Sequence, residues 1–319
     1  MVNRAKQDER LKRVEQLRGA PKAEALPGLI AALKSNVPLE VSTAARIAEE
    51  QGLVELLPEL EAMLRRAIKP ETRDRSSVAT AAVISACDSL GSGDVALFLD
   101  CCRASEGDPA GALRGRALFA LFRLQAGDGM LEAARMLADR TAGVRAAAAR
   151  AIANGSPLAG VPLLRFKALS GEEEPEVLEQ VFESLLALDP EGSVPFAARL
   201  LSVRSEALSS AAAMALGHSR SAAAAQSLID WADELPLDKL DLAFSSLAIL
   251  RQPAATKYLL GQIAEASLQR AQTAVLAISP FLYEQKLLAD VRLAAGKRPE
   301  VLRAVSRIAA SKEGVQGSV

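Results

Sequence analysis

The chain contains 319 residues, of which 50% are hydrophobic and only 3% aromatic, and its 38 basic and 39 acidic residues leave a formal net charge of −1. Large rings therefore cannot dominate the core, and the neutral balance excludes an overall positive field of the kind that steers a protein to nucleic acid. No stretch approaches the roughly 18 uncharged apolar residues that a membrane-spanning helix needs, and the charged first residues contain no apolar signal core. We therefore expect a cytoplasmic protein without membrane insertion.

Side chains that bind metals or act as nucleophiles are scarce. The chain has one histidine, His218, and three cysteines, of which Cys101 and Cys102 are adjacent in an apolar stretch. No Cys-x-x-Cys pair occurs, and the sequence predicts no metal, no cofactor and no catalytic group. Buried, reduced thiols are expected because the cysteines lie in apolar helical patterns and lack the basic, exposed surroundings that lower a thiol pKa. A redox role of the pair Cys101 and Cys102 stays open.

The first residues of the chain predict a capping helix. Residues 3–18 place Leu11, Val14 and Leu17 on one side and charges elsewhere. A polar outer face of this kind suits the end of a repeat array. We predict an N-terminal cap over residues 1–25, a repeat array over 26–310 and a flexible tail over 311–319.

Within the array, one helical pattern repeats at intervals of 28 to 37 residues. An aliphatic residue is followed by apolar residues three, four, seven and eight positions later, which is the stripe of an amphipathic helix. The first residues of successive stripes are Val41, Val78, Leu113, Val144, Val177, Leu208, Leu240, Leu268 and Val301.

Another helix is predicted before each stripe. Several begin with Leu-Pro or Val-Pro, in residues 26–33, 57–64, 161–169 and 194–201, and proline suits the first turn of a helix. Glycines that follow the stripes are expected to end the second helices; they are Gly52, Gly91, Gly155 and Gly217. The predicted fold is all-α, an α-solenoid (superhelix) of about nine stacked helix-turn-helix repeats.

Two segments resemble the HEAT-repeat family: "DPAGALRGRALFAL" (108–121) and "DRTAGVRAAAARAIANG" (139–155). Each has an aspartate, then an aliphatic residue and arginine, then an alanine-rich second helix. The resemblance covers roughly residues 26 to 310 and extends to the short repeats of the bilin-lyase group. It implies a stack in which second helices line a concave surface. Armadillo and tetratricopeptide arrays are the nearest rivals, but a three-helix unit is too long for this spacing and the Trp/Gly/Tyr marks are missing.

The alanine-rich second helix between residues 141 and 155 fits this reading. A helix flanked on both sides by other helices needs small residues where the backbones approach, and alanine combines small size with high helix propensity. Ile152 is predicted to be buried between adjacent helix pairs.

Arg114 and Arg145 hold the same position in consecutive repeats, each six residues after an aspartate, Asp108 or Asp139. The resemblance implies a ladder of ion pairs that ties loop to helix. The alternative is a basic strip on the concave surface that binds an acidic partner segment, enlarged by further arginines of the same helices. The candidate partner-binding residues are Arg114, Arg116, Arg145 and Arg150, with Arg123 beside them, and Arg73 and Arg75 from the basic loop 65–77.

Two other features have both a structural and a functional reading. Trp231 is the only tryptophan, and a role as core filler is favoured over a binding anchor. The glutamates of "SGEEEPEV" (170–177) stand at the start of a predicted second helix, where negative charge favours the helix N-terminus.

These features predict a non-enzymatic scaffold or adaptor that binds a partner protein or peptide on the concave face. One alternative is a nucleic-acid-binding HEAT-like protein, which interleaved charges and scarce aromatic residues disfavour. The other is a bilin-lyase-like or other enzyme accessory, which the resemblance leaves open. No small-molecule substrate is evident.

Overall fold

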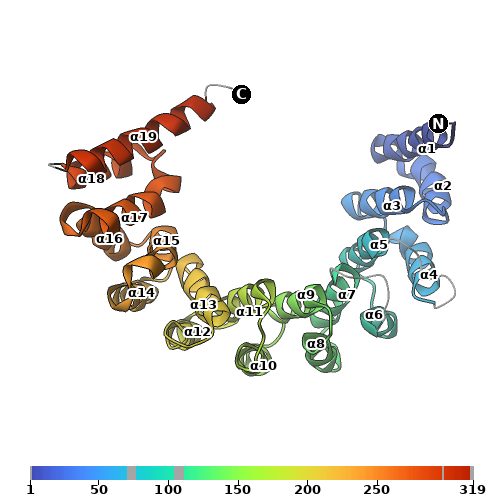
Figure 1. Cartoon of the computed structure of the whole chain (residues 1–319). Coiled ribbons are helices and arrows are strands. Elements are labelled where there is room, and N and C mark those ends of the chain that lie inside the picture. The colour runs from blue at the N-terminus through green and yellow to red at the C-terminus, as the bar shows by residue number, and fades with distance from the viewer. Residues whose placement is uncertain (1, 70–76, 104–110, 297, 317–319) are drawn as a thin grey trace. The chain divides into compact units, whose positions relative to one another are not determined.

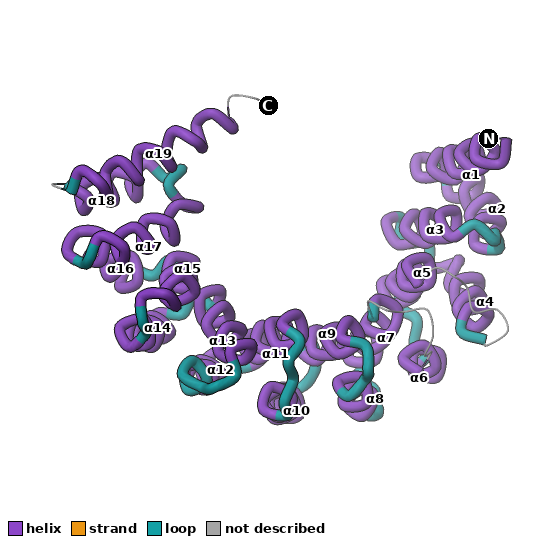
Figure 2. The backbone as a smooth tube through the Cα atoms, in the orientation of Figure 1, coloured by secondary structure: helices purple, strands orange, loops and turns teal. Residues whose placement is uncertain are grey.

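The structure, a computed structural model, describes residues 2–69, 77–103, 111–296 and 298–316. This part of the chain consists of helices joined by loops and turns, without a strand (Figures 1 and 2). It divides into two compact units, Met1–Lys167 and Ala168–Val319. After one leading helix, the described helices alternate in nine consecutive pairs. The prediction of an all-α solenoid of about nine helix-turn-helix repeats is confirmed.

In unit 1, helices α2, α4, α6 and α8 form one layer, and α3, α5, α7 and α9 form the other (Figure 1). The first helices of the pairs are α2 (Lys22–Leu33), α4 (Leu57–Ala67), α6 (Val95–Arg103) and α8 (Gly129–Leu137). The second helices are α3 (Pro38–Glu50), α5 (Ser77–Ser89), α7 (Ala112–Arg123) and α9 (Ala142–Ile152). Each second helix packs on its own first helix, and α3, α5 and α7 each also pack on the next second helix.

The leading helix α1 (Val2–Gln16) and the turn Leu17–Gly19 precede these pairs. Helix α1 packs on α3, in the place that the second helix of a preceding repeat would take. The role of this helix as a cap stays a prediction. The first pair begins at Lys22, four residues before the predicted start at residue 26.

Unit 2 continues the same alternation. Its second helices are α11 (Pro175–Leu188), α13 (Glu206–His218), α15 (Leu240–Leu250), α17 (Leu268–Ile278) and α19 (Pro299–Gln316). The first helices wholly within it are α12 (Pro190–Ala198), α14 (Ala222–Glu234), α16 (Pro253–Glu265) and α18 (Gln285–Ala295), and α10 (Pro157–Leu169) contains the division between the units. Helix α19 continues past residue 310, where the array was predicted to end; residues 317–319 lie outside the described part.

Three of the prolines predicted to start helices lie inside them. Helix α2 begins five residues before Pro27, α10 five before Pro162 and α12 five before Pro195. These helices therefore tolerate the loss of one backbone donor to the carbonyl four residues earlier. Only the proline at position 58 stands at its helix start, in α4.

Glycine and alanine let α7 and α9 approach closely. A Cβ atom added at Gly115 would lie 2.8 Å from the Cβ of Ala147, and one at Gly111 would lie 2.6 Å from the carbonyl oxygen of Gly143. No larger side chain fits between these backbones without displacing one of them. Ile152, at the end of α9, is fully buried, as predicted. Its burial contributes on the order of 1.5–3 kcal/mol to folding.

Candidate functional site

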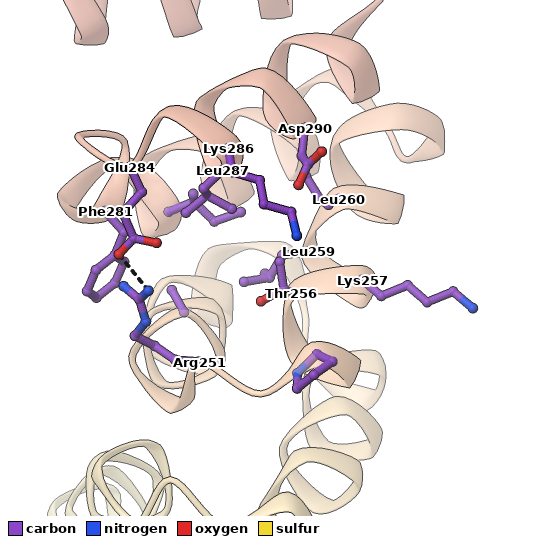
Figure 3. A pocket seen from close by; sticks show the side chains of 13 residues that line it. Arg251, Thr256, Lys257, Leu259, Leu260, Phe281, Glu284, Lys286, Leu287 and Asp290 are labelled. Carbon is purple, nitrogen blue, oxygen red and sulfur yellow. Dashed lines mark ion pairs between the residues drawn. The ribbon is translucent and has the colours of Figure 1, made fainter.

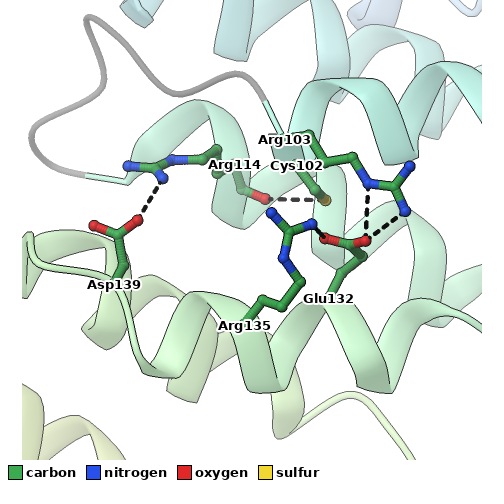
Figure 4. Close-up of polar contacts among 6 residues, drawn as sticks. All are labelled: Cys102, Arg103, Arg114, Glu132, Arg135 and Asp139. Carbon is green, nitrogen blue, oxygen red and sulfur yellow. Dashed lines mark hydrogen bonds and ion pairs between the residues drawn. The ribbon is translucent and has the colours of Figure 1, made fainter.

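Arg114 forms an ion pair that links two consecutive repeats. Its side chain is only 8% exposed, and Nη1 donates to Oδ2 of Asp139 at 2.8 Å (Figure 4). The partner predicted within its own repeat, Asp108, lies outside the described residues. The other carboxylate oxygen of Asp139 accepts from the N–H of Thr141 at 2.8 Å. Asp139 therefore joins α7 to the turn that starts α9.

The charge state of Asp139 follows from these contacts. Burial alone would raise the pKa of its carboxyl, but the Thr141 N–H and the Arg114 guanidinium together hold the pKa below its usual value. Asp139 is therefore ionised at neutral pH.

Arg145 closes the same turn in a different way. Its Nη1 donates to the backbone carbonyls of Asp139 at 2.9 Å and Arg140 at 3.1 Å. Arg114 and Arg145, predicted as equivalent members of one ladder, thus have different partners. Arg114 is buried and offers no accessible contact to a partner molecule.

A second charged cluster ties α6 to α8. Glu132 is 2% exposed and accepts from Arg103 Nη2 at 2.6 Å and from Arg135 Nη1 at 2.8 Å (Figure 4). Two half-exposed guanidinium groups therefore enclose one buried carboxylate. Such a cluster positions the first helices of neighbouring repeats.

The three thiols are buried, as predicted, and remain protonated. Burial raises the pKa of Cys101 to about 12, and it raises the pKa values of Cys87 and Cys102 still further. The Sγ of Cys102 lies 3.8 Å from the backbone carbonyl of Arg114. Because a thiolate is the reactive form, this environment does not favour redox chemistry at Cys101 and Cys102.

The exposed side of α7 carries an aromatic ring between two arginines. Phe119 is 42% exposed, and Arg116 and Arg123 lie three residues before it and four after it, on the same side of the helix. Arg116 donates to the hydroxyl of Ser85, and Arg123 donates to a carboxylate oxygen of Asp88. Both arginines are thereby oriented by α5. Sequence reasoning missed Phe119, although its spacing from the two arginines was visible.

Helix α9 adds Arg150, which is exposed. Helices α7 and α9 together contain five arginines and no acidic residue. With Arg114 buried and Arg145 bound to the turn, the exposed set is Arg116, Phe119, Arg123 and Arg150, which we name the arginine face. The remaining predicted site residues, Arg73 and Arg75, lie outside the described part of the chain.

Unit 2 contains a cavity of about 450 Å³ between α15, α16 and α18 (Figure 3). Arg251 closes one end, paired with Glu284 at 2.5 Å and stacked over the ring of Phe281 at 5.0 Å. The pairing with Glu284 raises the pKa of Arg251. Lys286 points toward Thr256, whereas the floor is aliphatic (Figure 3). These contacts tie the end of α15 to the start of α18.

Two further properties concern the described residues only. They include no group of three or more His, Cys, Asp or Glu residues placed to hold a metal ion. They also include no helix with the length and hydropathy that crossing a bilayer requires.

No protein-family model and no curated protein matches the sequence. Among solved structures, a mutant of Kap121p, a HEAT-repeat karyopherin, is similar over 93% of this chain at 14% identity, with a TM-score of 0.52. Kap121p itself is similar over 93% at 13% identity, with a TM-score of 0.51. The chain has a HEAT-like solenoid fold. It spans 40% of the length of Kap121p.

A weaker likeness connects the chain with the CpcE and CpcF complex of phycocyanin lyase from Nostoc sp. That match has 16% identity, covers 87% of this chain and 93% of the other, and has a TM-score of 0.34. A score this low does not bear on function.

Proposed function

We propose that this HEAT-like chain is a non-enzymatic, cytoplasmic scaffold that binds an acidic segment of a partner protein or peptide on the arginine face. The exposed Phe119 between Arg116 and Arg123 carries the proposal. Aromatic and arginine side chains are enriched among the residues that dominate protein interfaces. The chain has few aromatic residues, and this one is not used to fill the core.

Charge defines the kind of partner. The arginine face has three exposed guanidinium groups on two helices that contain no carboxylate. Asp88 and Ser85 on α5 hold Arg123 and Arg116 in place, so less side-chain entropy is lost when a partner binds. An acidic segment with one apolar side chain complements this surface: its carboxylates meet the arginines and its apolar group covers Phe119.

The fold supports a protein partner without identifying one. The similar structure of Kap121p belongs to a HEAT-repeat karyopherin. Stacked helices present several exposed second-helix positions in a row, which suits the binding of an extended segment.

Selection of displayed random peptides on the full chain tests the proposal. We expect the recovered peptides to be rich in Asp and Glu and to contain an apolar residue. Binding of a recovered peptide should weaken about tenfold or more in Phe119→Ala and in the double variant Arg116→Gln with Arg150→Gln. Arg292→Gln, on the exposed side of α18, is the matched control and should bind normally. Neutral or basic peptides, or binding unchanged in both arginine-face variants, would refute the proposal.

A further inference from the structure

The cavity of about 450 Å³ between α15, α16 and α18 has an apolar lining. Leu259 and Ile278 line it with side chains that are only 1% and 2% exposed, and Leu260 and Leu287 line it with partly exposed ones. Its volume lies within the range of roughly 300–1,000 Å³ that is typical of ligand pockets. The cavity therefore has room for one apolar side chain and the polar groups attached to it.

Three polar side chains meet at this apolar lining. Lys286 and Asp290 come from α18, one helical turn apart, and Thr256 comes from α16. Lys286 points toward Thr256, across the cavity (Figure 3). Within the described residues, none of the three side chains forms an ion pair or a hydrogen bond with another residue. Water satisfies these groups in the free protein, and a ligand with matching groups can take the place of that water.

One end of the cavity is a fixed wall. Arg251 pairs with Glu284 at 2.5 Å and lies over the ring of Phe281 at 5.0 Å. The backbone of Arg251 has a φ of +56°, in the left-handed region where a helix end usually has glycine. This helix end therefore keeps a large side chain despite the strained backbone. A wall that is already formed lowers the entropy lost on binding.

The combination of groups identifies the ligand. An ammonium and a hydroxyl donate hydrogen bonds to a carboxylate, whereas the carboxylate of Asp290 accepts from an N–H. The last residue of a peptide carries a carboxylate, a backbone N–H and a side chain on one carbon atom. A residue inside a peptide lacks the carboxylate, and a fatty acid lacks the N–H.

We propose that this cavity binds the C-terminal residue of a peptide or protein when that residue is apolar. Its carboxylate accepts from Lys286 and Thr256, its N–H donates to Asp290, and its side chain contacts Leu259 and Ile278. The site uses residues of unit 2 alone and does not depend on the arginine face.

Calorimetric titration of the full chain with short peptides tests the proposal. Acetyl-Gly-Gly-Leu with a free carboxylate should bind at millimolar concentration, and added salt should weaken the binding. The same peptide with a C-terminal amide keeps the shape and removes the charge, and it should bind about tenfold or more weakly. Acetyl-Gly-Gly-Ser keeps the carboxylate and removes the apolar group, and it should also bind about tenfold or more weakly.

Two lysines near the cavity provide a matched pair of variants. Lys286→Gln should lose about tenfold or more in affinity for the free carboxylate and should bind the acid and the amide alike. Lys257→Gln removes the same charge from a side chain that points away from the cavity (Figure 3) and should bind normally. Both lysines are exposed, and circular dichroism checks that both variants are folded.

A further variant separates this site from the arginine face. The double variant Arg116→Gln with Arg150→Gln, which should lose the acidic peptides, should bind acetyl-Gly-Gly-Leu normally. A loss in that variant would place the peptide on the arginine face and overturn the proposal. Absence of heat with the free carboxylate, equal binding of the amide or the serine peptide, or equal effects of Lys286→Gln and Lys257→Gln would overturn it as well.

Discussion

Two of the second helices in unit 1, α7 and α9, and three in unit 2, α11, α13 and α15, have equivalent places in the repeats and opposite charge. In unit 1, α7 and α9 contain five arginines and no acidic residue. In unit 2, α11 exposes Glu176, Glu179 and Glu183, and α11, α13 and α15 contain no lysine or arginine. The buried stripe is what stacking requires, so the exposed positions are free to differ. Repeats that fold alike can thus offer surfaces to different partners.

The internal packing of the two units is similar, although their surfaces differ. A Cβ atom added at Gly115 of α7 would lie 2.8 Å from Ala147 of α9, and one added at Gly217 of α13 would lie 2.8 Å from the backbone oxygen of Ser246 in α15. Both units therefore use a glycine to bring successive second helices together. The comparison predicts that core substitutions destabilise the two units to a similar extent. Surface substitutions should affect the two units differently.

Truncation of the buried stripe should have the largest effect. Ile152 in α9 and Leu216 in α13 are both fully buried, and replacement of either by alanine should lower the free energy of unfolding by about 2–5 kcal/mol. Urea denaturation followed by circular dichroism measures this loss. A cost below about 0.5 kcal/mol at either position would mean that the stripe is wrongly assigned there.

Alanine at the close helix approaches comes next. Gly115→Ala and Gly217→Ala should each cost about 1–3 kcal/mol, because a methyl group has to displace the facing helix. Gly93→Ala is the control, since nothing lies within 4 Å of a Cβ added there. Equal melting temperatures for all three variants would argue against the backbone approach.

Gly217 also shows how far the sequence could predict the fold. The periodic stripe and the spacing of the repeats identified nine helix pairs, because both depend on local amphipathicity. The same glycine was predicted to end its helix, yet it lies inside α13, where it faces α15. A glycine is needed both at a helix end and at a close approach, so a single sequence does not distinguish the two roles. Gly52 and Gly91, with φ of +62° and +86°, do end helices as predicted.

The candidate site was less predictable, since it depends on contacts between repeats. Arg114 and Arg145 occupy equivalent sequence positions, but stacking buries the first against Asp139 and leaves the second on backbone carbonyls. The three-residue and four-residue spacing of Arg116, Phe119 and Arg123 indicates a shared side. Whether that side is exposed depends on which neighbours cover it.

Loss of the ion pair between Arg114 and Asp139 should have an intermediate effect on stability. Arg114→Gln leaves the partly buried carboxylate of Asp139 without its cation, which should cost about 1–3 kcal/mol in unfolding free energy. Arg292→Gln, at an exposed position of unit 2, should change stability by less than about 0.5 kcal/mol. An equal, small change in both variants would show that the pair adds nothing to stability.

The stabilisation that the ion pair between Arg114 and Asp139 provides should also depend on pH. The pKa of Asp139 is lowered in the folded chain, so its stabilisation is complete above the unfolded value of about 3.9 and is lost as the pH falls through the folded value. The difference in unfolding free energy between the unmodified chain and Arg114→Gln should therefore be constant near neutral pH and shrink below about pH 4. Urea titrations at several pH values measure it. A difference that grows on acidification would contradict the ion pair.

The smallest effect on stability is expected where the effect on binding is largest. Arg116 and Arg150 are exposed, so their joint replacement by glutamine should change the unfolding free energy by less than about 1 kcal/mol. The same double variant should lose most of its affinity for a selected acidic peptide, and the remaining binding should depend less on salt because fewer charges take part. Joint replacement of Arg114 and Arg145 should do the reverse, lowering the melting temperature while peptide affinity stays the same. If both double variants lowered peptide affinity and stability together, a distorted stack would explain the loss of binding. That result would contradict the assignment of binding to the arginine face and of stability to Arg114 and Arg145.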